Sequence, residues 1–177
     1  GCKIKANNTT GDAADQTVVT YKNGYFQFYF SLGTWTISEA MQDGWSATTP
    51  AEFSVPVTKQ FKCEHVRFKN RTDYACVDAY KLDAFDGSGL PNWQISLQPA
   101  YGGTAILGIT DGMGWVRFNK VTPGQYIITE IFSAAQELAW RPAGVTLDGV
   151  SVVSPTKMTL TASGSCRTVK FMNRQNK

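Results

Sequence analysis

Histidine is almost absent from this chain, which also has little net charge and no long apolar run. One His among 177 residues, with four Cys that never form C-x-x-C, argues against a metal centre or a redox motif. We therefore expect no metal and no cofactor. A net charge of +3 from scattered basic residues argues against nucleic acid or a membrane surface as a partner. No apolar stretch has the length of a membrane span, and no signal peptide is recognisable. If the protein is secreted, we expect these residues to be a mature or excised portion.

What the chain does contain is short runs of β-branched and aromatic residues. Apolar residues make up 42%, enough for a folded core. Gly, Asn, Asp and Pro separate the runs, as between strands. The sequence therefore predicts an all-β protein with at most a two-turn helix, in SAAQELAW (133–140). The runs include YFQFYF (25–30), HVRFKN (65–70), NWQISLQ (92–98) and YIITEI (126–131).

An internal repeat divides the chain. The stretch 23–45 parallels 113–140: each has a Gly, an aromatic strand, a Gly-containing turn, a second strand and then Glu. CEHVRFKNR (63–71) likewise parallels CRTVKFMNR (166–174). We predict two copies of one domain, residues 1–71 and 76–177. The connection RTDYA is very short, which favours a stiff tandem.

Three polar side chains of the second copy are predicted to point into its core. Side chains alternate along a strand, so Glu130, Lys81 and Asn173 each share a face with apolar residues of their own strand. Uncompensated burial of such groups costs several kcal/mol. A Glu at a strand end that reaches water is the plainer interpretation. However, the first copy has Glu39 at the equivalent place, which favours a role.

Placed together, these groups have a specific chemistry. Apolar surroundings lower the pKa of a Lys and raise that of a Glu. A neutral Lys81 amine is a nucleophile, and a protonated Glu130 can polarise the carboxamide of Asn173. Attack with loss of ammonia leaves an amide cross-link.

Several motifs resemble Cna B-type (prealbumin-like) domains. KLDAFDGSGLPNWQISL (81–97) is similar to the opening of that family, ITDGMGWVRFNKVTPGQYIITE (109–130) to its central segment and FMN (171–173) to its closing strand. These domains build the stalks of bacterial surface adhesins and pili. The resemblance implies Greek-key, Ig-like β-sandwiches and a self-formed isopeptide bond, with Lys81 as amine donor, Glu130 as promoter and Asn173 as acceptor. SAAQELAW is longer than the usual turn of the family.

The first copy matches this pattern only in part. Glu39 and Asn70 occupy the promoter and acceptor positions. In one alignment KIKANNTTG (3–11) is the first strand and Lys3 is the donor. In the other, which we favour, CKIKA (2–6) is the second strand, because Cys2 precedes its Glu by 37 residues, as Trp93 does in the second copy. Domain 1 would then lack its first strand, which preceding sequence or a neighbouring subunit would supply.

The cysteines suit an extracellular protein. The family places its first and last strands side by side and parallel, which implies a Cys76–Cys166 disulfide. Free buried thiols are the alternative. Cys63 has no evident partner within the chain, and a Cys2–Cys63 pair is not expected.

Three functions compete. The first is a structural module of an extracellular, cell-surface fibre or adhesin stalk, whose partners are neighbouring domains or subunits of the same fibre. The second is a glycan- or ligand-binding sandwich. The third, an enzyme, is disfavoured because His is nearly absent and the cross-link forms only once per domain.

Overall fold

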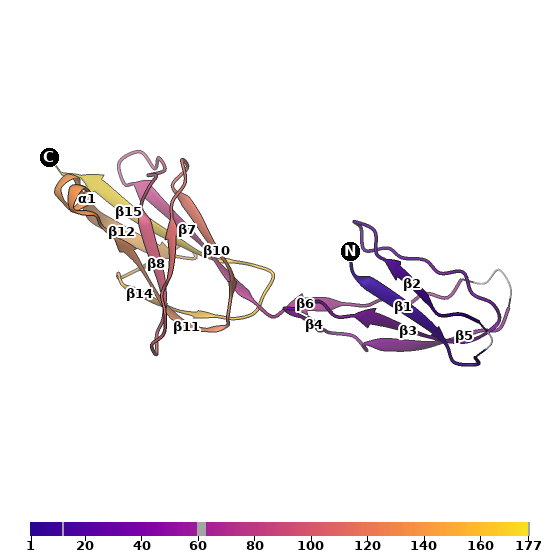
Figure 1. Cartoon of the computed structure of the whole chain (residues 1–177). Coiled ribbons are helices and arrows are strands. Elements are labelled where there is room, and N and C mark those ends of the chain that lie inside the picture. Colours follow the sequence, from indigo (N-terminus) through magenta and orange to yellow (C-terminus); the bar gives the residue numbers. More distant parts are fainter. Residues whose placement is uncertain (12, 60–62, 177) are drawn as a thin grey trace. The chain divides into compact units, whose positions relative to one another are not determined.

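The computed structural model describes residues 1–11, 13–59 and 63–176. The chain divides into two compact units, Gly1–Thr72 and Asp73–Lys177, and nearly all of its regular structure is β-strand. This confirms the predicted all-β fold (Figure 1). In the described part of the chain, no helix has the length and apolarity needed to cross a membrane.

The second unit is a two-sheet sandwich. One sheet has the order β10-β7-β15-β12-β13 and the other β14-β11-β8-β9, so strands far apart in sequence lie side by side, as Greek-key connections require. The elements are β7 (Ala75–Asp83), β8 (Gln94–Pro99), β9 (Ile106–Ile109), β10 (Trp115–Val121), β11 (Gly124–Ile131), α1 (Ala134–Ala139), β12 (Trp140–Leu147), β13 (Val150–Val152), β14 (Thr156–Leu160) and β15 (Arg167–Gln175).

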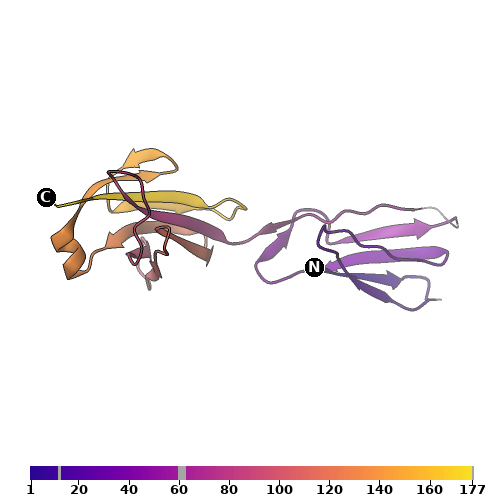
Figure 2. The same ribbon diagram turned by 90° about the horizontal axis from the view of Figure 1, so that it is seen from above.

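The strands β7 and β15 hold the central positions of their sheet. They pair in parallel, with Lys81 opposite Phe171 and Asp83 opposite Asn173. In Figure 2 the yellow β15 runs beside the magenta β7. Their inward residues alternate with outward ones and are completely buried, as for Val77 and Val169. The two inner faces together form one hydrophobic core.

The predicted short helix is present as α1. Ser133 caps it: its side chain accepts a hydrogen bond from the backbone N–H of Gln136, while the Gln136 side chain accepts one from the backbone N–H of Ser133. This reciprocal capping box satisfies backbone donors at the helix start. None of the helix residues is buried, so α1 contributes little to the core.

The first unit contains one complete sheet and a short ribbon. The sheet has the order β2-β1-β3-β5, and the ribbon pairs β4 with β6. Its core is centred on Ile4, Trp35 and Ile37. The strands are β1 (Lys3–Asn8), β2 (Gln16–Val19), β3 (Gly33–Ala40), β4 (Trp45–Ala47), β5 (Glu52–Val57) and β6 (Asn70–Thr72).

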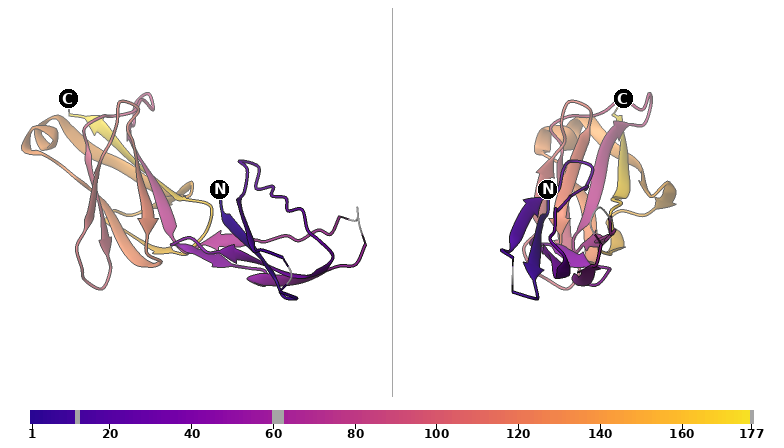
Figure 3. Two further views of the ribbon diagram at one scale, coloured as in Figure 1. Left: turned by 45° about the vertical axis from the view of Figure 1, so that its right-hand side comes forward. Right: turned by 90° about the vertical axis from the view of Figure 1, so that its right-hand side faces the viewer.

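Two predicted strands of the first unit differ from expectation. Residues 25–30 lie in an extended trace without strand pairing, and of 65–70 only Asn70 belongs to a strand (Figure 3). Phe26, Phe28 and Phe68 nevertheless pack against the core. The sequence gives these segments the alternation of strands, but a strand also needs a hydrogen-bonded neighbour on its edge.

The two units correspond strand by strand in the complete sheet. The order β2-β1-β3-β5 matches β9-β8-β11-β14. The register matches as well, because Ile4 pairs with Glu39 and Ile95 pairs with Glu130. In this correspondence β1 is equivalent to β8, the second strand of its unit.

Candidate functional site: a buried lysine, glutamate and asparagine

The candidate site of the second unit is built from both sheets. Lys81 on β7 and Asn173 on β15 come from adjacent strands of one sheet, and Glu130 on β11 comes from the sheet that faces it. Lys81 and Asn173 are completely buried, and the Glu130 side chain is 5% exposed. The alternation of each strand thus brings three polar groups into the core at one point.

A single carboxylate oxygen joins the three side chains. Lys81 Nζ donates to Glu130 Oε2 at 2.5 Å, and Asn173 Nδ2 donates to the same oxygen at 3.2 Å. The amine and the carboxamide are therefore held on one atom of the glutamate. Asn173 Oδ1 is buried and has no hydrogen-bond partner. A buried carbonyl without a partner is costly, so this arrangement requires an explanation.

Aromatic rings surround the amine. Lys81 Nζ lies 4.4 Å from the centroid of the Trp93 ring and 5.9 Å from that of Phe132. Trp93 packs edge-on against both Phe132 and Trp140. The sequence alone does not place Trp93 beside Lys81. Trp93 and Trp140 stand next to the ends of predicted strands, and this position does not specify which residues their rings contact.

Burial lowers the pKa of Lys81 to about 8, although its hydrogen bond and attraction to Glu130 act in the opposite direction. An amine with this pKa is neutral in a sizeable fraction of molecules near neutral pH. A nucleophilic amine, a proton acceptor and a carboxamide thus lie together in an enclosed apolar site.

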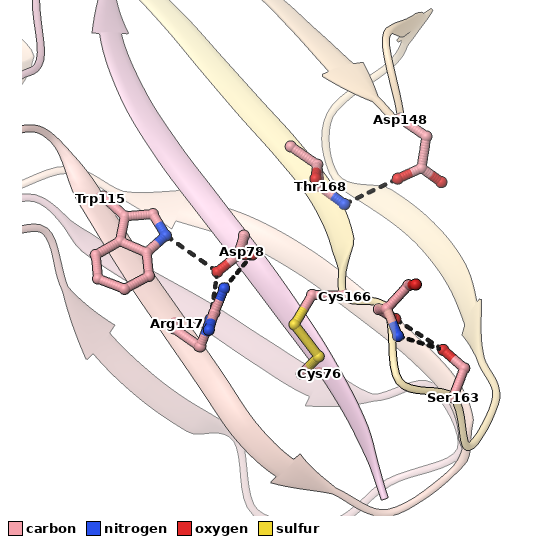
Figure 4. The surroundings of a disulfide bond; sticks show 9 residues. Cys76, Asp78, Trp115, Arg117, Asp148, Ser163, Cys166 and Thr168 are labelled. Atoms are coloured by element: carbon pink, nitrogen blue, oxygen red, sulfur yellow. Dashed lines mark hydrogen bonds and ion pairs between the residues drawn. A yellow bond between two sulfur atoms is a disulfide. The ribbon is translucent and has the colours of Figure 1, made fainter. Parts of the chain in front are cut away.

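The predicted Cys76–Cys166 disulfide is present at the start of β7 and just before β15, five residues along β7 from Lys81. It joins β7 to β15, with the two Cα atoms 4.6 Å apart (Figure 4). Near the disulfide, Arg117 binds the carboxylate of Asp78 through two nitrogens, and the Trp115 indole donates to it as well. This ion pair holds the pKa of Asp78 below its usual range. The first and last strands of the unit are therefore covalently joined at one end.

The first unit contains the acidic and amide groups of the same site. Asn70 Nδ2 donates to Glu39 Oε2 at 2.8 Å, and Asn70 Oδ1 is buried without a partner. The backbone register agrees too, because Asn70 pairs with Ala47 as Asn173 pairs with Pro142. Promoter and acceptor positions are therefore repeated in both units.

No lysine of the described chain occupies the place of Lys81 in the first unit. Lys3 is exposed and has the outward parity of β1, whereas its neighbour Ile4 is the residue opposite Glu39. Cys2 takes the place of Trp93, and burial and a hydrogen bond with Glu39 raise the pKa of its thiol. Cys2 and Cys63 are both free thiols.

Within the described ranges, no three His, Cys, Asp or Glu side chains are grouped closely enough to hold a metal ion. A pocket in the second unit, lined by Asn92, Gln94, Phe132, Ser133 and Gln136 among others, shares Phe132 with the surroundings of Lys81, but Lys81, Glu130 and Asn173 do not line it.

Of the comparisons with known proteins, only the one with solved structures finds a match. No family model matches the chain, and no curated protein matches it. Solved structures do resemble it. The chain is 13% identical to a mutant shaft pilin SpaA from Lactobacillus rhamnosus GG, covering 100% of this chain and 94% of that one with a TM-score of 0.49. It is 17% identical to the Bacillus anthracis TIE protein, covering 99% of this chain and 31% of that one with a TM-score of 0.43. It is 14% identical to GBS52, the minor pilin of Streptococcus agalactiae, covering 100% and 84% with a TM-score of 0.39.

The chain spans about a third of the TIE protein and 57% of a streptococcal ancillary pilin that it also resembles. Identities and TM-scores this low transfer no function, so the functional argument below stands on the site itself.

Proposed function

We propose that this chain is a structural module of an extracellular fibre or adhesin stalk at the cell surface, rigidified by a self-formed Lys81–Asn173 isopeptide bond. The observation that carries the proposal is that Lys81 Nζ and Asn173 Nδ2 bind the same oxygen of Glu130 inside a closed core. The resemblance of the sequence to Cna B-type domains points to the same chemistry.

The reaction needs proton transfers through Glu130 and one exchange of bonds. Glu130 takes a proton from the Lys81 ammonium, which leaves a neutral amine. If the Asn173 carboxamide turns over, its Oδ1 faces the protonated Glu130 and accepts a hydrogen bond that polarises Cγ. Nζ then attacks Cγ, the Cγ–Nδ2 bond breaks, and Glu130 gives its proton to Nδ2, which leaves as ammonia. The second proton that Nζ loses passes to the Glu130 carboxylate. The product is an amide between the two side chains.

Burial favours a structural role over an enzymatic one. Lys81 and Asn173 are fully covered, so an external substrate has no access to the reacting atoms. The bond also consumes both residues, so the reaction occurs once in each molecule. Together with the Cys76–Cys166 disulfide, it would fasten the first and last strands of the unit at two points.

A ligand-binding sandwich is the second candidate. Tyr21 and Tyr25 are 68% and 54% exposed, and their rings are nearly parallel with centroids 6.3 Å apart. Exposed flat rings can bind sugars. Glycan binding that is lost in Tyr21→Ala and Tyr25→Ala, but retained in Tyr101→Ala, would favour this candidate.

The mass of the intact, reduced chain tests the first candidate. We expect the chain to lack the mass of one ammonia relative to its sequence, since among the residues that the structure describes only the second unit holds a lysine beside its asparagine. Lys81→Ala and Asn173→Ala should each restore the full mass for their sequence, whereas Lys170→Ala, an outward residue of β15, should not. A full sequence mass in the unaltered protein would refute the cross-link.

The promoter is tested separately. We expect Glu130→Ala to fold, held by its disulfide, but to keep the ammonia, because no group then polarises the Asn173 carboxamide or carries a proton to the leaving nitrogen. An unpaired buried amine also destabilises the unit. Glu137→Ala, on the exposed helix α1, is the matched control. Complete cross-linking in purified Glu130→Ala would exclude the promoter role.

A further inference from the structure

The first unit has an opening where the second unit has β7. In the second unit β7 lies between β10 and β15. The equivalent segments of the first unit are 25–31 and 65–69, and no strand ladder joins them in the part of the chain that the structure describes. Figure 3 shows 25–31 as an extended trace without an arrow. Two extended segments with strand-like alternation thus flank a position without a described strand, and the rings of Phe26 and Phe68, one from each segment, meet with centroids 6.2 Å apart.

The side chains beside the opening are less buried than their equivalents in the second unit. In the second unit Val169 and Phe171 of β15 are completely buried next to β7. Their equivalents Val66 and Phe68 have the same inward parity but are only partly buried, although they pack against the core. Phe26 on the other side is also only partly buried. An inserted strand would complete their burial, which favours binding.

A pocket lies at the end of the opening where the lysine would belong. It has a volume of about 110 Å³ and is lined by Cys2, Glu39, Met41, Gln42, Trp45 and Asn70. By the strand correspondence, Cys2 is the equivalent of Trp93, which lies over the Lys81 amine, and Trp45 is the equivalent of Trp140, which packs against Trp93. The buried Oδ1 of Asn70, which has no partner, belongs to a residue of its wall. The pocket therefore offers a lysine the same surroundings, without the lysine.

We propose that this opening binds a β-strand of a neighbouring subunit of the same fibre, which carries a Lys at the position of Lys81 and a Cys five residues before it. The strand lies parallel to 65–69 and its Lys becomes joined to Asn70, while its Cys pairs with Cys63. The proposal rests on the isopeptide chemistry proposed for the second unit.

The register follows from the paired strands of the second unit. There Phe171 is opposite Lys81 and Trp115 is opposite Tyr80. Transferred to the first unit, the incoming Lys lies opposite Phe68, and the residue before it lies opposite Tyr25. The inward positions two, four and six residues before the Lys hold small apolar residues in β7 (Ala, Val and Ala), and the same pattern suits a gap between aromatic rings.

The position of the cysteine on the incoming strand follows from the same correspondence between the two units. Cys63 stands seven residues before Asn70, as Cys166 stands seven before Asn173, and Cys166 is joined to the Cys five residues before Lys81. Cys63 is exposed and free, so a thiol on the incoming strand can reach it. Among the described residues, only the cysteine that would pair with Cys63 is missing.

The segment beside the opening is accessible from outside the unit. Tyr25 and Tyr29, on the outward face of 25–31, are 54% and 81% exposed. No described residues cover that face, and the opening can therefore receive a strand after the unit has folded.

Both covalent steps balance. In the first, Glu39 accepts a proton from the incoming Lys ammonium, Nζ bonds to Asn70 Cγ, and the Cγ–Nδ2 bond breaks. Glu39 gives its proton to the leaving nitrogen, which departs as ammonia, and takes up the second proton that Nζ loses as it becomes an amide. In the second, the two thiols lose two electrons and two protons to a low-molecular-weight disulfide, which is reduced to its thiols.

The test uses the whole chain and a synthetic peptide ACVDAYKLD, the sequence of β7. The peptide is added to the folded protein with oxidised glutathione, and the products are measured by mass after reduction. We expect an adduct that weighs protein plus peptide less one ammonia. Peptide mapping should place it between the peptide Lys and Asn70. Before reduction, mapping should also place a disulfide between the peptide Cys and Cys63.

Matched variants identify the site. We expect the reduction-resistant adduct to be lost in Asn70→Ala and in Glu39→Ala, and with a peptide whose Lys is replaced by Arg, but retained in Asn173→Ala and in Asn23→Ala. The Arg peptide should still protect backbone amides of 25–31 and 65–69 from hydrogen exchange. An adduct that persists in Asn70→Ala, or a disulfide at Cys2 rather than Cys63, would overturn the assignment.

Two further outcomes concern the source of the strand. If the peptide reacts only when it is refolded together with unfolded protein, the strand belongs to the folding of the unit itself and the neighbouring-subunit proposal is wrong. A stable dimer of the chain alone, with 25–31 protected at its interface, would also overturn it, because a second copy then covers the opening.

The proposal and the function on which it rests fail in different ways. If the second unit has lost its ammonia but the peptide forms no adduct, the strand proposal alone falls. If the second unit keeps its full mass, the isopeptide chemistry falls for both units.

Discussion

The two units share a glutamate hydrogen-bonded to an asparagine, but among the described residues only the second unit places a lysine beside this pair. Asn70 Nδ2 lies 2.8 Å from Glu39 Oε2 with no described lysine beside them, whereas Asn173 Nδ2 lies 3.2 Å from Glu130 Oε2 with Lys81 beside them. The glutamate carboxylate and the asparagine carboxamide therefore form their hydrogen bond even where no lysine lies beside them. Their geometry depends on the pairing of β3 with β1 and of β6 with β4, which is complete in the first unit. The first strand is needed to bring the nucleophile and to close the second layer.

The largest expected effect comes from removing both covalent links of the second unit. Closing a loop of about 90 residues contributes about 4–5 kcal/mol in the chain-entropy relation, and a second link beside the first closes a short ring that contributes about 3 kcal/mol. Cys166→Ala and Asn173→Ala should thus each cost about 3 kcal/mol, and the double variant about 7–8 kcal/mol. Hydrogen exchange in denaturant, resolved to residues 75–175, measures this free energy of unfolding. If the loss in the double variant equals the sum of the two single losses, the two links do not close the same loop of about 90 residues.

A smaller loss is expected when the aromatic cover of Lys81 is removed. Trp93 is 3% exposed, and its equivalent in the first unit is Cys2. Trp93→Ala should cost about 3–5 kcal/mol, as for other buried large-to-small changes. It should also slow cross-linking of freshly synthesised chain, since water then reaches the amine. Phe85→Ala, which is 94% exposed, serves as control and should change neither quantity. An unchanged rate in Trp93→Ala would separate the aromatic cover from the chemistry.

The titration of Lys81 gives the next effect. Asn173→Ala keeps the amine free, and burial lowers the pKa of Lys81 from 10.5 to about 8. Between these pH values the unfolded chain binds the proton and the folded chain does not, so the free energy of unfolding rises with pH. The gain should be about 3 kcal/mol from pH 8 to pH 10.5. Denaturant titrations at several pH values measure it, with Lys81→Met/Asn173→Ala as reference. Equal slopes in the two variants would exclude a depressed lysine pKa.

The smallest effect concerns α1, which is absent from the described part of the first unit. Ser133→Ala removes a capping hydrogen bond and should cost about 1 kcal/mol, confined to this exposed helix. Faster hydrogen exchange in 134–139 alone should report it, with Ser163→Ala as control. Faster exchange throughout β11 as well would mean that α1 supports Glu130.

Much of the second unit follows from strand alternation alone. Lys81, Glu130 and Asn173 are predictable as inward residues because the side-chain period of a strand is two and each has apolar partners on its face. Their meeting at one oxygen requires the pairing of β7 with β15. The sequence suggests this pairing only through its resemblance to a family.

The rest depends on neighbours that local sequence does not specify. YFQFYF has the composition and alternation of a strand, yet residues 25–30 form no ladder, because hydrogen bonding depends on what lies beside the segment. The contact of Trp93 with Lys81 is similar, since a ring at a strand end can turn to either side. Sequence thus predicted the face of each side chain better than its partner.

The disulfide between β7 and β15 also determines how the second unit responds to mechanical force. A pull applied through Tyr74 and Arg174 would pass from Cys76 directly to Cys166 and bypass the residues between them. These two positions are 90 residues apart in sequence, so the oxidised unit keeps roughly 300 Å of extended chain out of reach of the load. After reduction of the disulfide, this length of chain is kept from extending only if another link joins the two strands. In single-molecule stretching, the length released after reduction would show whether a second covalent lock remains.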